Sequence, residues 1–234
     1  MTFEKRIQIE ASSPESVPWT VQDVWFTMTF LVFYVVMEYA SAHIVGLTAY
    51  KKNIGIYAAF FEIILLIPII WLVFKKYHAS WSALGFRSFK GIAVGMGCGF
   101  LVLVYIVNFF LAILLALLKV SPSVNWVTTI QNISSPWWLV MTGVILAPLV
   151  EEIFFRGFVF TGLRQRFGWV KAMLISAVVF AIGHMQITNL IPIFLLGCAL
   201  AYLYQYSKSL WPSILIHMTT NAIGFAVALL LATR

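Results

Sequence analysis

The chain of 234 residues carries too few charges to cover the surface of a soluble fold. Hydrophobic types make up 62% of it and charged types 10%, with a formal net charge of +7, whereas soluble domains are about 45–50% apolar and about 25% charged. This composition excludes a secreted or cytosolic globular domain, a disordered chain and a coiled coil. The apolar runs are long and continuous, so they favour membrane-spanning helices over a transmembrane barrel.

A polar segment is followed by seven apolar segments of about membrane-spanning length. Residues 1–22 are polar and are expected at the membrane interface, without the pattern of a cleavable signal peptide. Spans are expected at 24–46, 55–74, 92–118, 137–163, 169–186, 188–206 and 210–232. The expected fold class is all-α, a polytopic transmembrane helical bundle of about seven spans, with eight as the alternative. Residues 23–234 are expected to form one membrane domain.

The distribution of lysine and arginine between the loops predicts the orientation of the bundle. With the N-terminus inside, the inner segments contain ten such residues and the outer segments contain four. The inner residues are Lys5, Arg6, Lys75, Lys76, Arg87, Lys90, Arg164, Arg166, Lys171 and Lys208, and the outer ones are Lys51, Lys52, Lys119 and Arg234. Because cytoplasmic loops carry the excess of Lys and Arg, we expect a multi-pass protein, in the cell membrane if the organism is bacterial, with a cytoplasmic N-terminus. The scattered positive charges indicate contact with lipid headgroups and no nucleic-acid partner.

Three charged residues lie close together inside the fourth expected span. A charge at mid-bilayer costs about 2.5–3.5 kcal/mol, so the presence of Glu151, Glu152 and Arg156 in one span requires an explanation. Glu152 and Arg156 are four residues apart and share a helix face, whereas Glu151 is rotated by about 100°. Arginine can bind a carboxylate bidentately. The pattern predicts one carboxylate held by Arg156 and one, Glu151, left for chemistry; a structural ion network is the alternative.

The fifth and the last expected spans contribute further polar side chains. His184 ends the fifth span, and taken alone such a histidine is more often structural. His217 and Asn221 are four residues apart on one face of the last span, where they either bond to neighbouring helices or form a site. At 1.5 Å per residue, Glu151, His184 and His217 lie about 12–21 Å from the inner ends of their spans, so a shared pocket is geometrically allowed.

The remaining polar and sulfur-containing residues in the apolar runs carry weaker signals. Glu38, His43 and Glu62 are interpreted as structural or partner-contacting residues. Cys98 and Cys198 lie inside apolar runs and indicate neither a disulfide framework nor a thiolate metal site. A GxSxG motif is absent from the sequence, and neither cysteine has a histidine nearby, which argues against a serine or thiol mechanism.

Three motifs occur in order over residues 140–225. They are EExxxR (Glu151, Glu152, Arg156), FxxxH (Phe180, His184) and HxxxN (His217, Asn221). Together they resemble the CAAX-processing and bacteriocin-processing endopeptidases, also called the Abi family, which includes the type II CAAX prenyl endopeptidases. The resemblance implies a helical membrane peptidase whose site lies inside the bundle, whereas the first three spans show no specific signature.

The resemblance also implies the role of each motif residue. Glu151 and His184 would activate a water molecule, His217 and Asn221 would stabilise the oxyanion, and the other two residues of the first motif would shape the site. Peptide hydrolysis requires these functions: a base for the water, a proton for the leaving amine and donors for the oxyanion. The implied partners are the lipid bilayer and a membrane-associated peptide or protein, of prenylated CAAX type or related to bacteriocins.

The dependence of the reaction on a metal is left open by the residues. The family has been described both as metal-dependent and as using a glutamate-activated water without a metal. If a metal is used, Glu151, His184 and His217 would hold Zn²⁺ with one open position. The zinc-protease motif HExxH is absent from the sequence, so we expect no cofactor.

Two other classes of function are compatible with polar residues in membrane helices. A proton-coupled transporter uses buried Glu, Arg and His residues, but it would favour internal pseudo-symmetry, whereas these charges cluster in the last spans. A non-catalytic membrane scaffold would not need four polar groups to converge. The sequence therefore favours an intramembrane endopeptidase.

Overall fold

The computed structural model describes residues 16–45, 49 and 52–233. Most of the segment expected at the interface, 1–22, lies outside this part, and so do the side chains of Glu38 and His43. The described residues form helices and connecting turns, with no strand among them. The all-helical class that the composition predicts is therefore confirmed.

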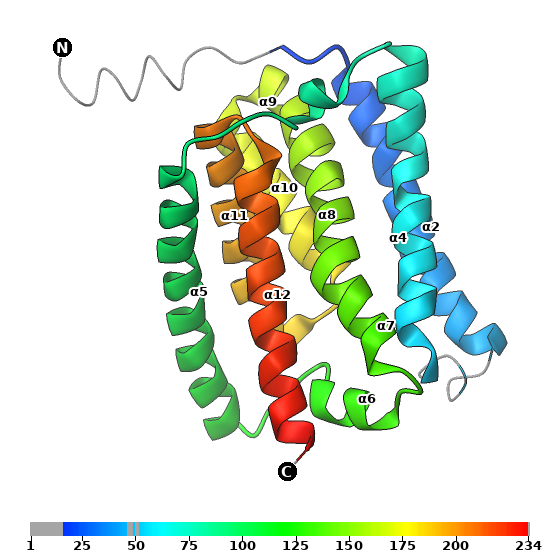
Figure 1. Ribbon diagram of the computed structural model, residues 1–234, viewed down its shortest axis with the longest axis vertical. Helices are drawn as coiled ribbons and strands as arrows, with labels where there is room; N and C mark the ends of the chain where they lie inside the picture. The colour runs from blue at the N-terminus through cyan, green and yellow to red at the C-terminus, as the bar shows by residue number, and fades with distance from the viewer. Residues whose placement is uncertain (1–15, 46–48, 50–51, 234) are drawn as a thin grey trace.

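Within the described residues, seven helical stretches stand side by side as a bundle (Figure 1). They are α2 (Val21–Val45), α4 (Ile54–Ile70) with the π-helical turn η1 (Trp71–Lys76), α5 (Ile92–Leu117), the continuous stretch Pro136–Phe167, α10 (Trp169–Gly183), α11 (Leu190–Ser207) and α12 (Leu210–Ala232). Short helices lie between them: η2 (Trp81–Leu84), α6 (Trp126–Asn132) and η5 (Ile187–Asn189). The long stretches match the seven expected spans in order and place.

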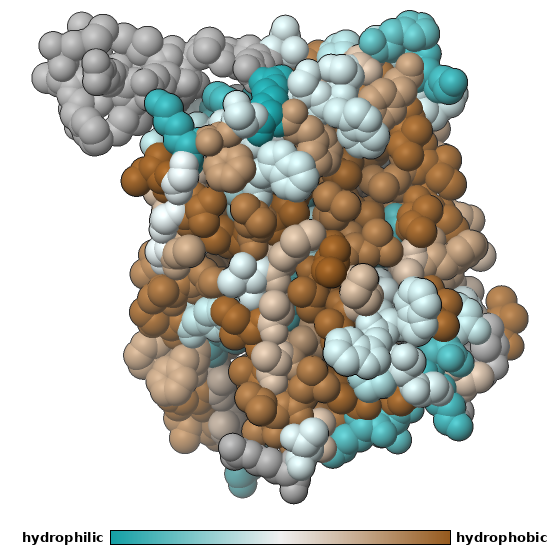
Figure 2. Space-filling view, viewed as in Figure 1, coloured by the Kyte–Doolittle hydropathy of each residue, from teal (hydrophilic) through white to brown (hydrophobic). Residues whose placement is uncertain are grey.

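Six of these stretches are long and apolar enough to cross a membrane. The exception is α10, because its 15 residues cover only about 22 Å at 1.5 Å per residue, against a hydrocarbon core of about 30 Å. The fifth span, expected at 169–186, is thus shorter than predicted. Hydrophobic residues cover much of the visible face of the bundle, and hydrophilic residues gather towards its ends (Figure 2). These features are those of a multi-pass membrane protein.

The stretch Pro136–Phe167 alternates between α-helical and π-helical turns. In order it consists of α7 (Pro136–Val140), η3 (Met141–Leu146), α8 (Ala147–Glu152), η4 (Ile153–Phe160) and α9 (Thr161–Phe167). At the end of η3 the N–H of Ala147 bonds to the carbonyl of Thr142, five residues back. The next residue, Pro148, has no N–H to donate. Neither residue therefore donates to the carbonyl of Gly143, which is left for another partner.

Most lysine and arginine residues of the described part gather at one end of the bundle, which we call the basic end. It comprises the end of η1, the connection from η2 to α5, α9, the start of α10 and the turn between α11 and α12 (Figure 1). These segments carry Lys75, Lys76, Arg87, Lys90, Arg164, Arg166, Lys171 and Lys208, whereas Lys52 and Lys119 stand just before α4 and just after α5, at the opposite end. Hydrogen bonds join the loops at the basic end. The N–H of Leu210 donates to the carbonyl of Gly85 at 2.8 Å, and the Ser209 hydroxyl donates to the carbonyl of Arg87 at 2.7 Å.

The half of the bundle near the basic end is closely packed. All eight residues of η4 are buried, and the Trp19 ring stacks on Phe158 with the ring centres 5.0 Å apart. The Trp19 indole N–H also donates to the carbonyl of Phe158 at 3.0 Å. Gly162 allows Trp19 and α2 to pack this closely, because a Cβ there would lie 3.0 Å from the Trp19 side chain and 2.5 Å from that of Val24. This packing fixes the stretch that carries Glu151 and Glu152.

Candidate functional site

A cavity of about 530 Å³ lies among the helices. Its wall is built from α2, α4, α5, α6, α10, α11, α12 and the stretch Pro136–Phe167. Glu151, His184, His217 and Asn221 all line it. The structure therefore brings together the four residues predicted to carry the reaction, although they come from three separate helical stretches.

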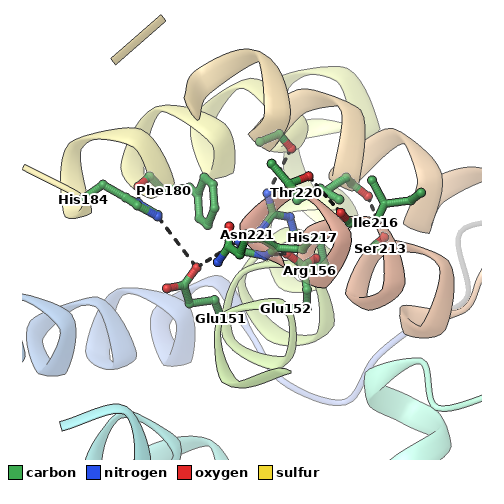
Figure 3. A network of polar contacts seen from close by, with 12 residues as sticks. Glu151, Glu152, Arg156, Phe180, His184, Ser213, Ile216, His217, Thr220 and Asn221 are labelled. Carbon is green, nitrogen blue, oxygen red and sulfur yellow. Dashed lines mark hydrogen bonds and ion pairs between the residues drawn. The ribbon is translucent and has the colours of Figure 1, made fainter. Parts of the chain in front are cut away.

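Glu151 occupies the centre of this group and extends from α8 towards His184 at the end of α10 (Figure 3). Its Oε2 atom lies 3.9 Å from His184 Nε2 and 3.7 Å from His217 Nε2. These separations are too long for direct hydrogen bonds, and this buried oxygen has no hydrogen-bond partner within the described part of the chain. Buried polar atoms in folded proteins are normally paired with protein or with ordered water.

The orientation of His184 is set by the helix that precedes it. Its Nδ1 lies 2.7 Å from the carbonyl of Phe180, four residues earlier. Since a carbonyl only accepts, Nδ1 carries the hydrogen and Nε2 presents a lone pair towards Glu151 when the ring is neutral. The Phe180 ring packs edge-on against the imidazole, with the centres 4.5 Å apart.

Glu152, Arg156 and His217 form a buried network behind the cavity. Arg156 Nη1 donates to Glu152 Oε1 at 2.7 Å, and both side chains are fully buried. His217 Nδ1 lies 2.9 Å from the same carboxylate oxygen. The structure differs from the expected bidentate pair, because Arg156 Nη2 donates instead to the carbonyl of Gly197, at 3.1 Å. One guanidinium thus links η4 to α11.

The position of His217 determines which of its nitrogens faces the cavity. Nδ1 is engaged with Glu152, so Nε2 is the atom that faces Glu151. Because a carboxylate is an acceptor, His217 donates from Nδ1 to it. His217 can donate a second hydrogen bond from Nε2 only when both of its nitrogens carry hydrogens.

Asn221 lies one turn further along α12 and is held by the π-helical turn across the cavity wall. Its Nδ2 donates to the carbonyl of Gly143 at 2.7 Å, the carbonyl that the bonding of Ala147 and the ring of Pro148 leave available. An amide nitrogen has two hydrogens. One hydrogen of Asn221 therefore orients the side chain, and the second remains for a bound ligand.

The residues considered as zinc ligands approach one another without forming a ligand set. Within the described ranges, no group of three His, Cys, Asp or Glu side chains is arranged to hold a metal ion. His217 directs its Nδ1 to Glu152 and Glu151 faces both imidazoles. A histidine that binds zinc through one nitrogen often bonds a carboxylate through the other, so the use of a metal stays an open prediction and the steps proposed for this site are those of the protein's own residues.

Several parts of the site were not predicted from the sequence. Glu62, interpreted as structural or partner-contacting, lines the same cavity and is 5% exposed. The carbonyls of Gly143 and Gly197 orient Asn221 and Arg156, and no side-chain pattern points to a backbone acceptor. The role of Phe180 could have been found from sequence, because a histidine four residues later in a helix lies beside its carbonyl.

Residues 133–223 match the family model described as type II CAAX prenyl endopeptidase Rce1-like. The three motifs fall inside this range, from Glu151 to Asn221. The match confirms the resemblance that the motifs indicate.

Three curated proteins are similar to parts of the chain. The "Putative membrane peptidase YdiL" of Bacillus subtilis is 32% identical over 83 residues, covering 36% of this chain and 34% of that protein. An "Uncharacterized 24.3 kDa protein" of Escherichia coli is 28% identical over 160 residues, covering 66% and 72%. The "UPF0177 protein YxdF" of Lactococcus lactis is 30% identical over 90 residues, covering 38% and 49%. No solved structure matches the chain.

Proposed function

We propose that this protein is an intramembrane endopeptidase that hydrolyses a peptide bond of a membrane-associated substrate. One observation carries the proposal: a buried oxygen of Glu151, without a hydrogen-bond partner in the described part of the chain, faces two imidazole nitrogens at the wall of a cavity. Such an oxygen can be paired by a water molecule. The similarity to membrane peptidases also supports the proposed endopeptidase function.

The nucleophile in this proposal is a water molecule held between Glu151 and His184. The water donates one hydrogen to Glu151 Oε2 and the other to His184 Nε2, whose lone pair is exposed because Nδ1 bonds to Phe180. As the water oxygen attacks the substrate carbonyl carbon, Glu151 takes the proton. The product of this step is a tetrahedral intermediate with a negatively charged oxygen.

Asn221 and His217 stabilise this oxyanion. The second Nδ2 hydrogen of Asn221 is available, and the bond to Gly143 holds the amide in place beforehand. His217 donates from Nε2 when it carries both hydrogens, with Nδ1 held by Glu152. Donors that are oriented before the reaction are worth far more in a water-poor site than in bulk solvent.

Collapse of the intermediate completes the reaction. The carbon–nitrogen bond breaks, and the proton taken by Glu151 passes to the leaving amine, which yields a carboxylic acid and an amine. Glu152 and Arg156 are positioning residues, because they touch His217 and each other within a fully buried network. The substrate is a membrane-associated peptide, and prenylated CAAX-type or bacteriocin-related peptides are the candidates that the family resemblance supplies.

The decisive experiment is cleavage of a library of membrane-associated peptides by the purified protein in lipid vesicles. The wild type is compared with Glu151→Gln, which keeps the side-chain shape but removes the base. Glu62→Gln is the matched control, because it makes the same change in a buried carboxylate of the same cavity wall. Each reaction is run with and without a chelator.

We expect cleavage by the wild type and by Glu62→Gln, none by Glu151→Gln, and no loss with the chelator. Cleavage that a chelator abolishes and Zn²⁺ restores would contradict the glutamate-activated water. If a well-folded wild type cleaves no peptide, or Glu151→Gln cleaves as fast as the wild type, the endopeptidase proposal fails. The transporter and scaffold alternatives would then be preferred.

A further inference from the structure

The cavity is displaced towards one end of the bundle. In α4, which runs from the opposite end towards the basic end, the lining residues all lie between Ile54 and Leu65, within the first 12 of its 17 residues. In α10, which runs away from the basic end, the lining residues are Phe180 and Gly183 in the last turn. In α11, which runs back, they lie between Pro192 and Leu196, in the first two turns.

The turns that follow α10 complete the cavity on that side. Gln186 and Asn189 line it, and Ile187 between them is 84% exposed. Thr188 pairs with Ser123, so these turns are fixed at the end opposite the basic end. In Figure 1 this end holds α6 and the C-terminal end of α12.

The path from the cavity to the basic end along η4 is closed by side chains. All residues from Ile153 to Phe160 are buried, directly after the site residue Glu152. Phe154, Phe158 and Leu163 each have 0% exposure. A helical segment buried on every side leaves no aqueous passage beside it.

The charges indicate which side of the membrane each end faces. Eight of the ten loop and helix-end Lys and Arg residues in the described ranges lie at the basic end. Cytoplasmic loops hold this excess in membrane proteins. The basic end is therefore the cytoplasmic one, and the cavity faces the other side.

We propose that the substrate peptide reaches Glu151 from the extracytoplasmic half of the membrane, an inference that rests on the proposed peptidase function. The substrate is then a peptide exported across, or inserted into, the membrane rather than one anchored on its cytoplasmic face. The charges of the cavity wall favour binding of an apolar peptide that is neutral or positively charged. It carries the carboxylates of Glu62 and Glu151, and no Lys or Arg of the described ranges lines it to hold a free C-terminal carboxylate.

The test is the labelling of single cysteines in sealed vesicles. Cys98 and Cys198 are first replaced by serine, and one cysteine is then introduced per variant. Asn108→Cys places it in the cavity wall on α5, Ile187→Cys at the exposed end beside the cavity, and Ser80→Cys at the exposed basic end. A membrane-impermeant maleimide is applied to right-side-out and to inverted vesicles.

We expect Asn108→Cys and Ile187→Cys to be labelled in right-side-out vesicles, and Ser80→Cys only in inverted ones. Labelling of Asn108→Cys only in inverted vesicles would overturn the proposal, and so would its failure to react in both preparations. Labelling of Ser80→Cys from the outside would show that the basic end is extracytoplasmic and would overturn it as well.

A second readout separates this inference from the proposed function. Labelling does not need catalysis, so the same pattern is expected in a Glu151→Gln background. Peptide added outside right-side-out vesicles should be cleaved by the wild type, and peptide added outside inverted vesicles should not. If labelling is as expected but no preparation cleaves, the peptidase function fails while the sidedness of the cavity stands. Cleavage confined to inverted vesicles contradicts the sidedness alone.

Discussion

Replacement of Arg156 by methionine should destabilise the protein by breaking a fully buried ion pair. Arg156 and Glu152 both have 0% side-chain exposure, and their contact is 2.7 Å. Removing one partner of a buried pair leaves an uncompensated charge and costs about 3–5 kcal/mol. The variant also loses the bond to the Gly197 carbonyl and the contact of the guanidinium with the Phe180 ring, 4.4 Å from its centre.

The double variant Glu152→Gln/Arg156→Met distinguishes loss of the pair from loss of packing. It leaves no unpaired charge at this position, so it should recover about 1–3 kcal/mol of the loss. The unfolding free energies of the single and the double variant are measured in mixed micelles with increasing amounts of a denaturing detergent. Arg166→Met is the matched control, because this arginine is exposed in the same helical stretch, and it should change the unfolding free energy by less than about 0.5 kcal/mol. A double variant no more stable than Arg156→Met would refute the reasoning.

Three further outcomes are expected. Asn221→Ala should lower kcat about 10²–10³-fold with little change in KM, as for loss of an oxyanion donor; an unchanged kcat in steady-state assays would remove Asn221 from that role. Because carboxylates line the cavity, peptides with Lys near the cleaved bond should be cut about tenfold faster than those with Glu, and Glu62→Gln should reduce this ratio; equal rates would contradict it. Burial, assisted by the nearby charges of Arg164 and Arg87, lowers the pKa of Lys208 to about 8. Since the unfolded chain holds this proton up to the usual lysine range, stability should rise with pH above about 8; thermal unfolding should show this for the wild type and a flatter profile for Lys208→Met, and identical profiles would refute it.

Local spacing in the sequence was enough to predict those parts of the site that lie within one helix. Glu152 and Arg156 pair because residues four apart in a helix share a face. The same rule explains the contact between His184 and the carbonyl of Phe180. The composition likewise determined the all-helical membrane class, because long apolar runs can satisfy their backbone in lipid only as helices.

The end of the fifth span differs from the position that hydropathy predicts. Hydropathy placed it at 169–186, but α10 ends at Gly183. Apolar residues continue beyond it, with Met185 in a turn and Ile187 at the start of the short helix η5. A hydropathy pattern does not report where a helix ends when the segment that follows it also contains apolar residues.

The tertiary structure alone decided which helices meet at the site. Glu151 contacts residues 33 and 66 positions later in the chain, His184 and His217, and such contacts depend on the packing of whole helices. The bond between Asn221 and Gly143 also needs a π-helical turn and Pro148, which together free a carbonyl 78 residues away. The sequence determined which polar groups the membrane helices carry, because each apolar run and each spacing is a local property. Only the packing determined that they share one cavity and towards which end it is displaced, because that depends on the direction and contacts of every helix at once.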